Sequence, residues 1–326
     1  MKKLICILLS VLTILSVAAL AGCKKEEPTL KMGLGVYTVT KATSAGEKDG
    51  QGTATVTAAV ITVDADGKVV ACQLDTMDNK VSYTAEGKAV ANTAFKTKYE
   101  QGKDYNMVAY GNAVKEWYEQ ADAFETVVVG KTLDEIKALV VADTKKGTDA
   151  VIAAGCTIMV NEFVGAIEKA FANLADSAAT ASSTVKLGLH TEQKTTDATD
   201  EKAGTNQVET TVFAAAIDAE GKVQVAASDC VQVKFTFDKS GASTFDTTKA
   251  VSTKRELGAN YNMVAYGNAA KEWFEQADAF NTLCVGKTVS EIVALCANDN
   301  YGTDAVKAAG CTILVNGFTK AAAKLG

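Results

Sequence analysis

Three residue types are nearly absent from this 326-residue chain: it has one histidine (His190), one proline (Pro28) and one arginine (Arg255). A single histidine excludes a metal site built on two histidines and argues against histidine-based nucleophilic catalysis. The formal net charge is −6, lysine supplies nearly all of the positive charge, and no basic cluster occurs. We therefore expect no nucleic-acid partner, because binding to phosphate backbones depends on basic side chains.

Familiar catalytic motifs are missing as well. The sequence has no Cys-x-x-Cys pair, no Gly-x-Ser-x-Gly elbow, no phosphate-binding glycine loop and no calcium loop. We expect a redox carrier or binding protein and not an enzyme, with no metal site and no catalytic residue. Six cysteines follow the leader, and we interpret them as small buried apolar residues. If one disulfide exists, the best pair is Cys284 with Cys296, which flank a short helix. The six are Cys72, Cys156, Cys230, Cys284, Cys296 and Cys311.

The N-terminus has the pattern of a secretory leader. Lys2 and Lys3 precede an apolar run over 4–19, and Leu20-Ala21-Gly22-Cys23 follows. This ending resembles the lipobox of bacterial lipoproteins, which implies a signal peptide over 1–22, diacylglycerol on Cys23 and a tether over 23–29. The alternative is an uncleaved membrane helix, but the run is short for a span of about 20 residues. The predicted location is the cell membrane, lipid-anchored on its extracytoplasmic face.

One stretch occurs twice, at Tyr105–Glu125 and Tyr261–Asn281, and the two copies differ at three of 21 positions. Its apolar residues follow helical spacing, which predicts one long helix with a buried stripe that includes Tyr110, Val114 and Trp117. The opposite, polar face also recurs, which packing does not require. We interpret the stretch as a core helix, or as a helix whose polar face contacts the other half or a partner. That face contains Asn112, Lys115, Glu116, Glu119 and Asp122.

The repeat extends over the whole mature chain. It predicts a first repeat domain at 30–175, a small, polar linker at 176–184 and a second repeat domain at 185–326. In each, alternating apolar residues predict strands, such as Ala54 to Val60, and glycine-containing turns predict hairpins at 64–67 and 218–221. After the long helix come a short helix and a C-terminal strand–helix unit, whose strand we place at 156–160. Strands followed by helices indicate an α+β class with two tandem homologous domains.

Flat rings within the repeated stretch are candidates for stacking on an aromatic ligand such as an isoalloxazine. They come in matched sets: Tyr105, Tyr110 and Trp117, with Tyr261, Tyr266 and Trp273. Tyr110 and Tyr266 are the candidate cofactor-binding rings. The alternative is that these residues belong to the buried stripe and fill the core.

The repeated stretch around residues 111–124, with the Val-Gly-Lys-Thr that follows, resembles surface lipoproteins of Gram-positive bacteria built from two such repeats. Some members are pheromone-peptide precursors, and others resemble flavin carriers of extracellular electron transfer. The segment upstream of it is similar to the start of FMN-binding domains, where Asp-x-x-Ser-Gly-Ala-Thr accepts FMN phosphate on threonine. Here 149–157 and 304–312 come closest, which implies FMN contacts at Gly155 and Thr157, and at Gly310 and Thr312. Both segments have alanine for serine and cysteine for alanine.

The sequence therefore predicts a surface lipoprotein that binds or carries a flavin-like group, with FMN as the expected cofactor. Its partners would be membrane lipid through Cys23 and a redox or envelope protein at the surface. Two alternatives stay open: a non-enzymatic interaction or solute-binding module, and a pheromone precursor whose product is the cleaved leader.

We expect Cys23→Ala to leave the precursor uncleaved or to release the protein from the membrane, because the thioether to diacylglycerol cannot form. Membrane fractionation with mass spectrometry of the mature N-terminus checks this. Residues retained before Cys23, or an unmodified Cys23, would contradict it. Cys6→Ala, inside the apolar run, is the matched control.

Overall fold

The structure is a computed structural model that describes residues 27–92 and 94–325. The predicted signal segment and Cys23, the predicted lipidation site, lie outside the described residues. Among the described residues, no helix has the length and apolar character needed to cross a bilayer.

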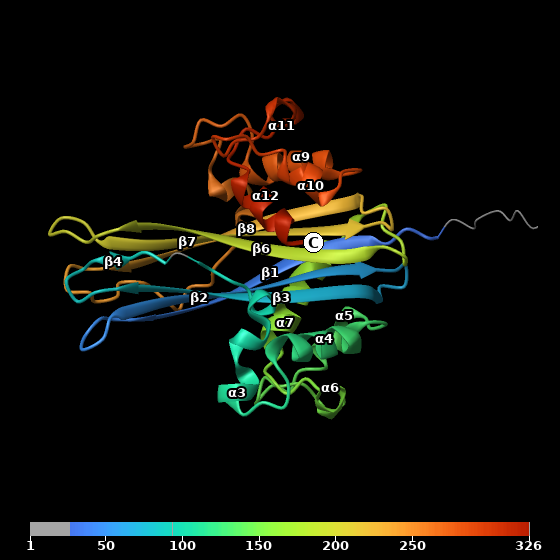
Figure 1. Ribbon diagram of the computed structural model, residues 1–326, viewed down its shortest axis with the longest axis horizontal. Helices are drawn as coiled ribbons and strands as arrows, with labels where there is room; N and C mark the ends of the chain where they lie inside the picture. Colours follow the sequence, from blue (N-terminus) through green and yellow to red (C-terminus); the bar gives the residue numbers. More distant parts are fainter. Residues whose placement is uncertain (1–26, 93, 326) are drawn as a thin grey trace, which may run out of the picture.

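Two antiparallel sheets lie face to face at the centre of the molecule (Figure 1). The first has the order β4-β3-β2-β1-β5 and the second β6-β7-β8. The predicted turns connect β2 to β3 and β7 to β8, and their glycines, Gly67 and Gly221, have positive φ as the turns require. The strands are β1 (Lys31–Thr43), β2 (Gly50–Val63), β3 (Val69–Tyr83), β4 (Ala89–Val90), β5 (Ala175–Asp176), β6 (Thr184–Thr196), β7 (Gly204–Ile217) and β8 (Val223–Phe237).

Helices cover the outer face of each sheet, so the layers run helix, sheet, sheet, helix (Figure 1). The predicted α+β class is confirmed. The first half has α2 (Lys98–Gln101), η1 (Gly102–Tyr105), α3 (Met107–Gly111), α4 (Trp117–Val128), α5 (Leu133–Lys137), α6 (Asp149–Ala154) and α7 (Asn161–Ala172). The second has α8 (Lys254–Leu257), η2 (Gly258–Tyr261), α9 (Trp273–Cys284), α10 (Val289–Val293), α11 (Asp304–Ala309), α12 (Asn316–Ala322) and η3 (Ala323–Leu325).

The inner faces of the two sheets share one core. Alternate residues of β2, such as Val56 and Val60, are buried in the same cluster as Val212 and Ala216 of β7. The other residues of these strands face the helices, so each half has a second core on its outer side. Both faces of each sheet are therefore buried, and the two halves form one hydrophobic unit.

Matched polar contacts hold the halves together at both ends of this interface. Glu100 of the first half pairs with Lys324 of the second at 2.9 Å, and Lys169 of the first half pairs with Glu256 of the second at 2.6 Å. At the hairpin ends, the N–H groups of residues 45 and 198 donate to the carbonyls of Gly241 and Gly87 at 2.7 and 2.8 Å. Each half thus contributes the same kinds of groups to both sides of the interface.

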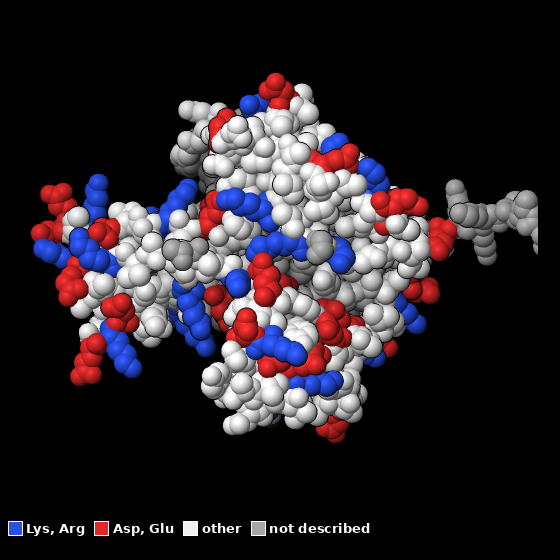
Figure 2. Space-filling view, in the orientation of Figure 1, with Lys and Arg blue, Asp and Glu red and all other residues white. Residues whose placement is uncertain are grey.

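The sheets project beyond the helical layers at one end. Figure 2 shows lysines and acidic residues interspersed over this projecting end. One ion pair there, Lys88 with Asp197 at 3.0 Å, also connects the two halves. Buried between the hairpins, the rings of Tyr83 and Phe237 stack with centroids 4.3 Å apart.

The predicted linker is held against the first sheet. Residues 175 and 176 pair with β1, and the N–H of Leu30 donates to the carbonyl of Ala179 at 2.8 Å. Ala179 is fully buried in the core between the sheets. The connection between the halves is therefore a fixed part of the interface.

The prediction of one long helix over the repeated stretch is wrong. The helix breaks after η1 at Asn106 and after α3 at Asn112, which both have left-handed φ angles, 61° and 52°. Asparagine tolerates this region better than other residues with a Cβ. Because the chain turns here, Tyr110 and Val114 leave the expected buried stripe and are 85% and 89% exposed.

Helix capping explains two of the recurring polar positions, Glu116 and Glu119. The carboxylate of Glu116 accepts the N–H groups of Met107 and Val108 at 2.9 and 3.3 Å, which caps α3. Its own N–H donates to Glu119 at 2.8 Å in the capping box that begins α4. Glu272 and Glu275 repeat these contacts in the second half. Local capping therefore accounts for Glu116 and Glu119, and contact of this face with a partner stays a prediction.

The strand predicted at 156–160 is also wrong. Only Met159 makes a ladder contact, an isolated bridge to Lys146, and Leu314 makes the same contact with Tyr301. Both faces of the sheet are already covered, so this apolar segment lies across the helical layer. Cys156 and Val160 are buried there and contribute to the outer core.

An isolated half would expose one side of the shared core. We expect a fragment of residues 27–180 to form a two-fold dimer, because it carries both Glu100 and Lys169 and the matching inner face. Sedimentation equilibrium at micromolar concentration measures its mass.

Charge reversal makes this prediction sharper. Glu100→Lys should weaken the dimer, and adding Lys169→Glu should restore it, since the pair is rebuilt with opposite signs. A folded monomer at all concentrations would contradict the expected dimer and show that the halves are independent.

Candidate functional site

Two of the predicted site residues, Gly155 and Thr157, lie together just after α6. Gly155 ends that helix with φ of 107°, and the ammonium of Lys115 lies 2.3 Å from the position that a Cβ of this residue would take. The N–H and the hydroxyl of Thr157 both donate to Oε1 of Gln120, at 2.8 and 3.0 Å. The repeated stretch thus supplies two side chains, Lys115 and Gln120, to the segment that resembles the flavin motif.

The second half repeats this arrangement. Gly310 ends α11 with φ of 100° under the ammonium of Lys271. The N–H and hydroxyl of Thr312 donate to Oε1 of Gln276 at 2.8 and 2.9 Å. The glutamines were not predicted, although their recurrence in the repeated stretch could have indicated them.

The other two predicted residues, Tyr110 and Tyr266, lie elsewhere. Each ring is 85% exposed on the segment before α4 or α9, and neither borders the groove described below. The alternative that they fill the core is wrong, because Asn106 and Asn112 turn the chain outward.

The remaining rings hold a lysine that the sequence interpretation missed. Nζ of Lys254 lies 5.1 Å from the ring centre of Tyr261 and 5.6 Å from that of Trp273. The side chain of Lys254 is only 7% exposed, and its ammonium pairs with Glu209 at 2.8 Å. Cation–π attraction strengthens when such a group is desolvated.

The first half has the same lysine between the same rings. Nζ of Lys98 lies 5.1 and 5.6 Å from the ring centres of Tyr105 and Trp117, and the lysine pairs with Asp78 at 3.4 Å. The sequence signal is a match upstream of the repeated stretch, Thr-Lys-x-Glu-x-Gly-x-x-Tyr, at 97–105 and 253–261. Extending the comparison by eight residues would have found it.

A groove opens beside these residues in the second half. Its larger part, here called the ring cavity, has a volume of about 390 Å³. It adjoins a smaller part of about 60 Å³, the acid recess, and both are lined by Lys194, Glu209, Trp273 and Leu314. Tyr261, Gln276, Tyr301 and Thr312 complete the polar and aromatic wall of the ring cavity. This size is at the lower end for small-molecule sites.

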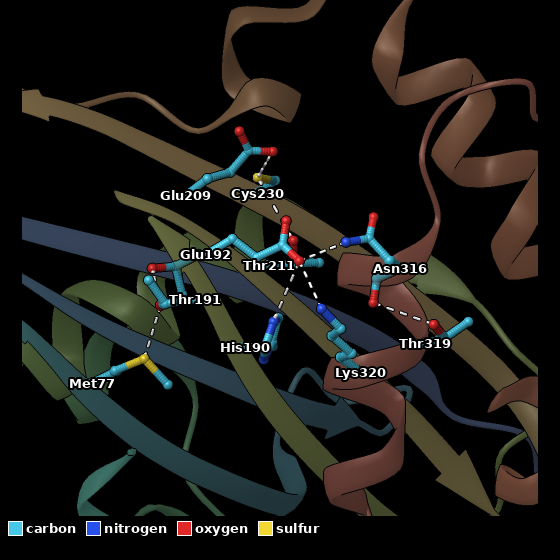
Figure 3. A network of polar contacts seen from close by, with 11 residues as sticks. Met77, His190, Thr191, Glu192, Glu209, Thr211, Cys230, Asn316, Thr319 and Lys320 are labelled. Atoms are coloured by element: carbon cyan, nitrogen blue, oxygen red, sulfur yellow. Dashed lines mark hydrogen bonds and ion pairs between the residues drawn. The ribbon is translucent and has the colours of Figure 1, made fainter. Parts of the chain in front are cut away.

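Glu192 and Glu209 lie on neighbouring strands in the acid recess (Figure 3). Oε1 of Glu192 accepts from Nδ2 of Asn316 at 2.5 Å and from Nζ of Lys320 at 2.9 Å. His190 Nε2 lies 3.7 Å from the same oxygen, beyond hydrogen-bonding distance. His190 and Lys320 lower the pKa of Glu192 to about 2, so this carboxylate is ionised at neutral pH.

A second group of acids with shifted pKa values lies in the first half. Burial raises the pKa of Glu125 to about 8 and that of Asp75 to about 7. In the second half, Asn281 and Arg255 take the places of Glu125 and Tyr99, and Arg255 pairs with Asp278 at 2.8 Å. Shifted carboxyls can indicate a functional site. However, no group of three or more potential ligands that could hold a metal is found among the described residues.

The six cysteines after the leader are free in this structure, and the pair Cys284–Cys296 does not form. Cys156, Cys230, Cys284 and Cys311 are buried, and burial raises the pKa of each thiol. They are therefore neutral, unreactive core residues, as the sequence indicated.

This chain matches no protein-family model, no curated protein and no solved structure.

The raised pKa of Glu125 predicts a pH-dependent stability. The unfolded chain releases this proton near pH 4.5 and the folded chain near pH 8, so stability should fall as the pH rises between these values. Glu125→Gln keeps the bond from the N–H of Leu74 and removes the charge. We expect it to stabilise the protein more at pH 8 than at pH 5.

Urea unfolding of both proteins at pH 5 and pH 8 measures this difference. Asp134→Asn, at an exposed carboxyl of α5, is the control and should change neither value. An equal effect of Glu125→Gln at the two pH values would show that Glu125 ionises normally.

Proposed function

We propose that this chain is a lipid-anchored, extracytoplasmic binding protein that carries a flavin-like group such as FMN in the groove of its second half. The observation that carries the proposal is the ring cavity, whose lining includes Tyr261, Tyr301, Lys194 and Thr312. Rings provide stacking surfaces, and an exposed lysine suits a phosphate. The protein performs no catalysis of its own in this proposal.

The contacts of Thr312 favour reversible over covalent binding. A phosphoester requires a free hydroxyl and a base, but this hydroxyl already donates to Gln276. Asp304, the motif aspartate, is the first residue of α11, and Thr312 follows the other end of that six-residue helix, which is about 9 Å long. Asp149 and Thr157 are separated in the same way by α6. The geometry therefore does not fit flavin transfer to either threonine.

The chain's own residues fit a reversibly bound flavin. Tyr261 and Tyr301 would flank the ring system, Lys194 would meet the phosphate, and Gln276 would keep Thr312 in place. The bound flavin would supply one- and two-electron transfer to a surface redox partner, while the protein provides binding and electrostatics.

The first half is a weaker candidate for the same ligand. Lys146 stands where the second half has Tyr301, and Thr55 where it has Glu209. Glu162 stands in the place of Gly317, with its carboxylate 3.5 Å from the hydroxyl of Thr57. Fewer rings and an extra side chain leave less aromatic surface for a ligand.

A second candidate function is a surface interaction module without a cofactor. Tyr110, Val114 and Tyr266 favour it, because large apolar side chains on a matched segment are almost fully exposed in both halves. Exposed apolar groups of this kind are typical of contact sites for other proteins.

Titration with FMN tests the main proposal. We expect quenching of flavin fluorescence with one site per chain, and about tenfold weaker binding for Tyr301→Lys, because loss of one stacked ring costs about 1 kcal/mol or slightly more. This variant introduces the residue of the first half. Lys146→Tyr, the reciprocal change, is the control for surface composition.

Two outcomes would count against the proposal. No change in flavin fluorescence at millimolar FMN would exclude a carrier role. Flavin that stays attached to the denatured protein, detected by mass spectrometry, would overturn the reversible mode. Pull-down from cell envelopes that is lost in Tyr110→Ala with Tyr266→Ala would instead support the interaction module.

A further inference from the structure

The acid recess contains a cross-strand pair of glutamates, which by itself would destabilise the sheet. Glu192 on β6 and Glu209 on β7 are directly opposite each other in the strand register. Like charges at such cross-strand positions repel and destabilise a sheet. The first half has Val39 opposite Thr55 at the same place. The acid pair therefore belongs to the second half alone.

Each carboxylate is held by a lysine from a different helix. Lys320 of α12 binds Oε1 of Glu192 at 2.9 Å, and Lys254 of α8 binds Oε1 of Glu209 at 2.8 Å. Oε2 of both residues makes no hydrogen bond within the part of the chain that the structure describes. Two carboxylates, each with one oxygen free of hydrogen bonds within the described residues, thus line one recess (Figure 3).

A buried hydroxyl in the recess also lacks its expected partners. In the first half, the hydroxyl of Thr57 bonds with Thr76 at 3.0 Å and meets Glu162 at 3.5 Å. The equivalent Thr211 is 6% exposed and has Cys230 and Gly317 in those places. Its only contact among the described residues is the sulfur of Cys230 at 3.9 Å, a weak one.

Gly317 creates the space. A Cβ at this position would lie 2.6 Å from the hydroxyl oxygen of Thr211, so any larger residue must displace it. Trp273, Leu314 and Phe318 form the apolar wall on the other side. The recess is thus a small cavity with acceptors and a hydroxyl on one side and apolar surface on the other.

The local charge decides which ligand this recess suits. Lys194, Lys254 and Lys320 are positive and outnumber the two carboxylates, so an ammonium or metal cation gains no net attraction. Neutral hydroxyl groups can donate to both carboxylates and accept from Thr211, and such charge-assisted bonds are strong. We propose that the acid recess binds a polyhydroxylated group, either the ribityl chain of a flavin in the ring cavity or a saccharide.

This inference rests on the proposed function, which supplies the flavin in the ring cavity. Three probes distinguish the polyol inference from the flavin proposal. Riboflavin has the flavin ring and the polyol, lumichrome has the ring alone, and ribitol is the polyol alone. We expect riboflavin to bind at least about tenfold more tightly than lumichrome, since each charge-assisted bond contributes substantially. Binding is measured by flavin fluorescence and by the fluorescence of Trp273 in a Trp117→Phe background.

Each substitution introduces the residue that the other half has at the equivalent position. Gly317→Glu should fill the recess and bring the ratio of riboflavin affinity to lumichrome affinity close to one. Glu192→Val should reduce this ratio about threefold. Glu162→Gly in the first half is the matched control and should leave the ratio unchanged. Circular dichroism and thermal unfolding verify that each variant is folded.

Each outcome has one meaning. Equal binding of riboflavin and lumichrome by the unmodified protein would overturn the polyol inference and leave the proposed function standing. Binding of ribitol or saccharides with no flavin binding would support the polyol inference and overturn the flavin proposal. If none of the probes binds, both are wrong.

Discussion

Burial of the two inner sheet faces against each other is the constraint on which the rest of this structure depends. Val56 and Val60 of the first half share a core with Val212 and Ala216 of the second, so neither sheet has a free face. At about 25 cal/mol for each Å² of apolar surface, this shared core is a major part of the stability of both halves. The inner faces are packed against each other, and the groove of the second half forms on an outer face, beside the helices.

The acid recess, on the outer side of the second sheet, is one place where the two halves differ. The strands that build the shared core have equal lengths in both halves, and β3 and β8 have the same burial pattern. By contrast, Val39, Thr55 and Glu162 are replaced by Glu192, Glu209 and Gly317 around the acid recess. The strand lengths and burial pattern of the joint core are thus shared, whereas the groove of the second half has charge and space that the first half lacks. This division is expected if one half acts mainly as a partner for the sheet of the other.

Local patterns predicted the local structure. Alternating apolar residues identified the strands, and the glycines at 67 and 221 identified the hairpins. The helix break could not be read from spacing, because it depends on left-handed Asn106 and Asn112 and on a carboxylate, Glu116, that caps a helix nine residues earlier. The sequence did indicate burial on both faces of β2, because residues 58–61 are all apolar and do not alternate with polar residues. Of the predicted site residues, only Thr312 lines the groove, because the groove brings together strand and helix residues that are far apart in the chain.

Internal structure accounts for most of the repeated stretch but not for its exposed rings. Capping requires Glu116 and Glu119, the turns favour Asn106 and Asn112, and the core requires the tryptophans. Tyr110 and Tyr266 cap nothing, and both rings stand in solvent to the same extent. An exposed ring gains nothing from folding, and a polar residue there would cost no stability. Tyr110 and Tyr266 are therefore the positions of the repeated stretch that its internal contacts do not explain.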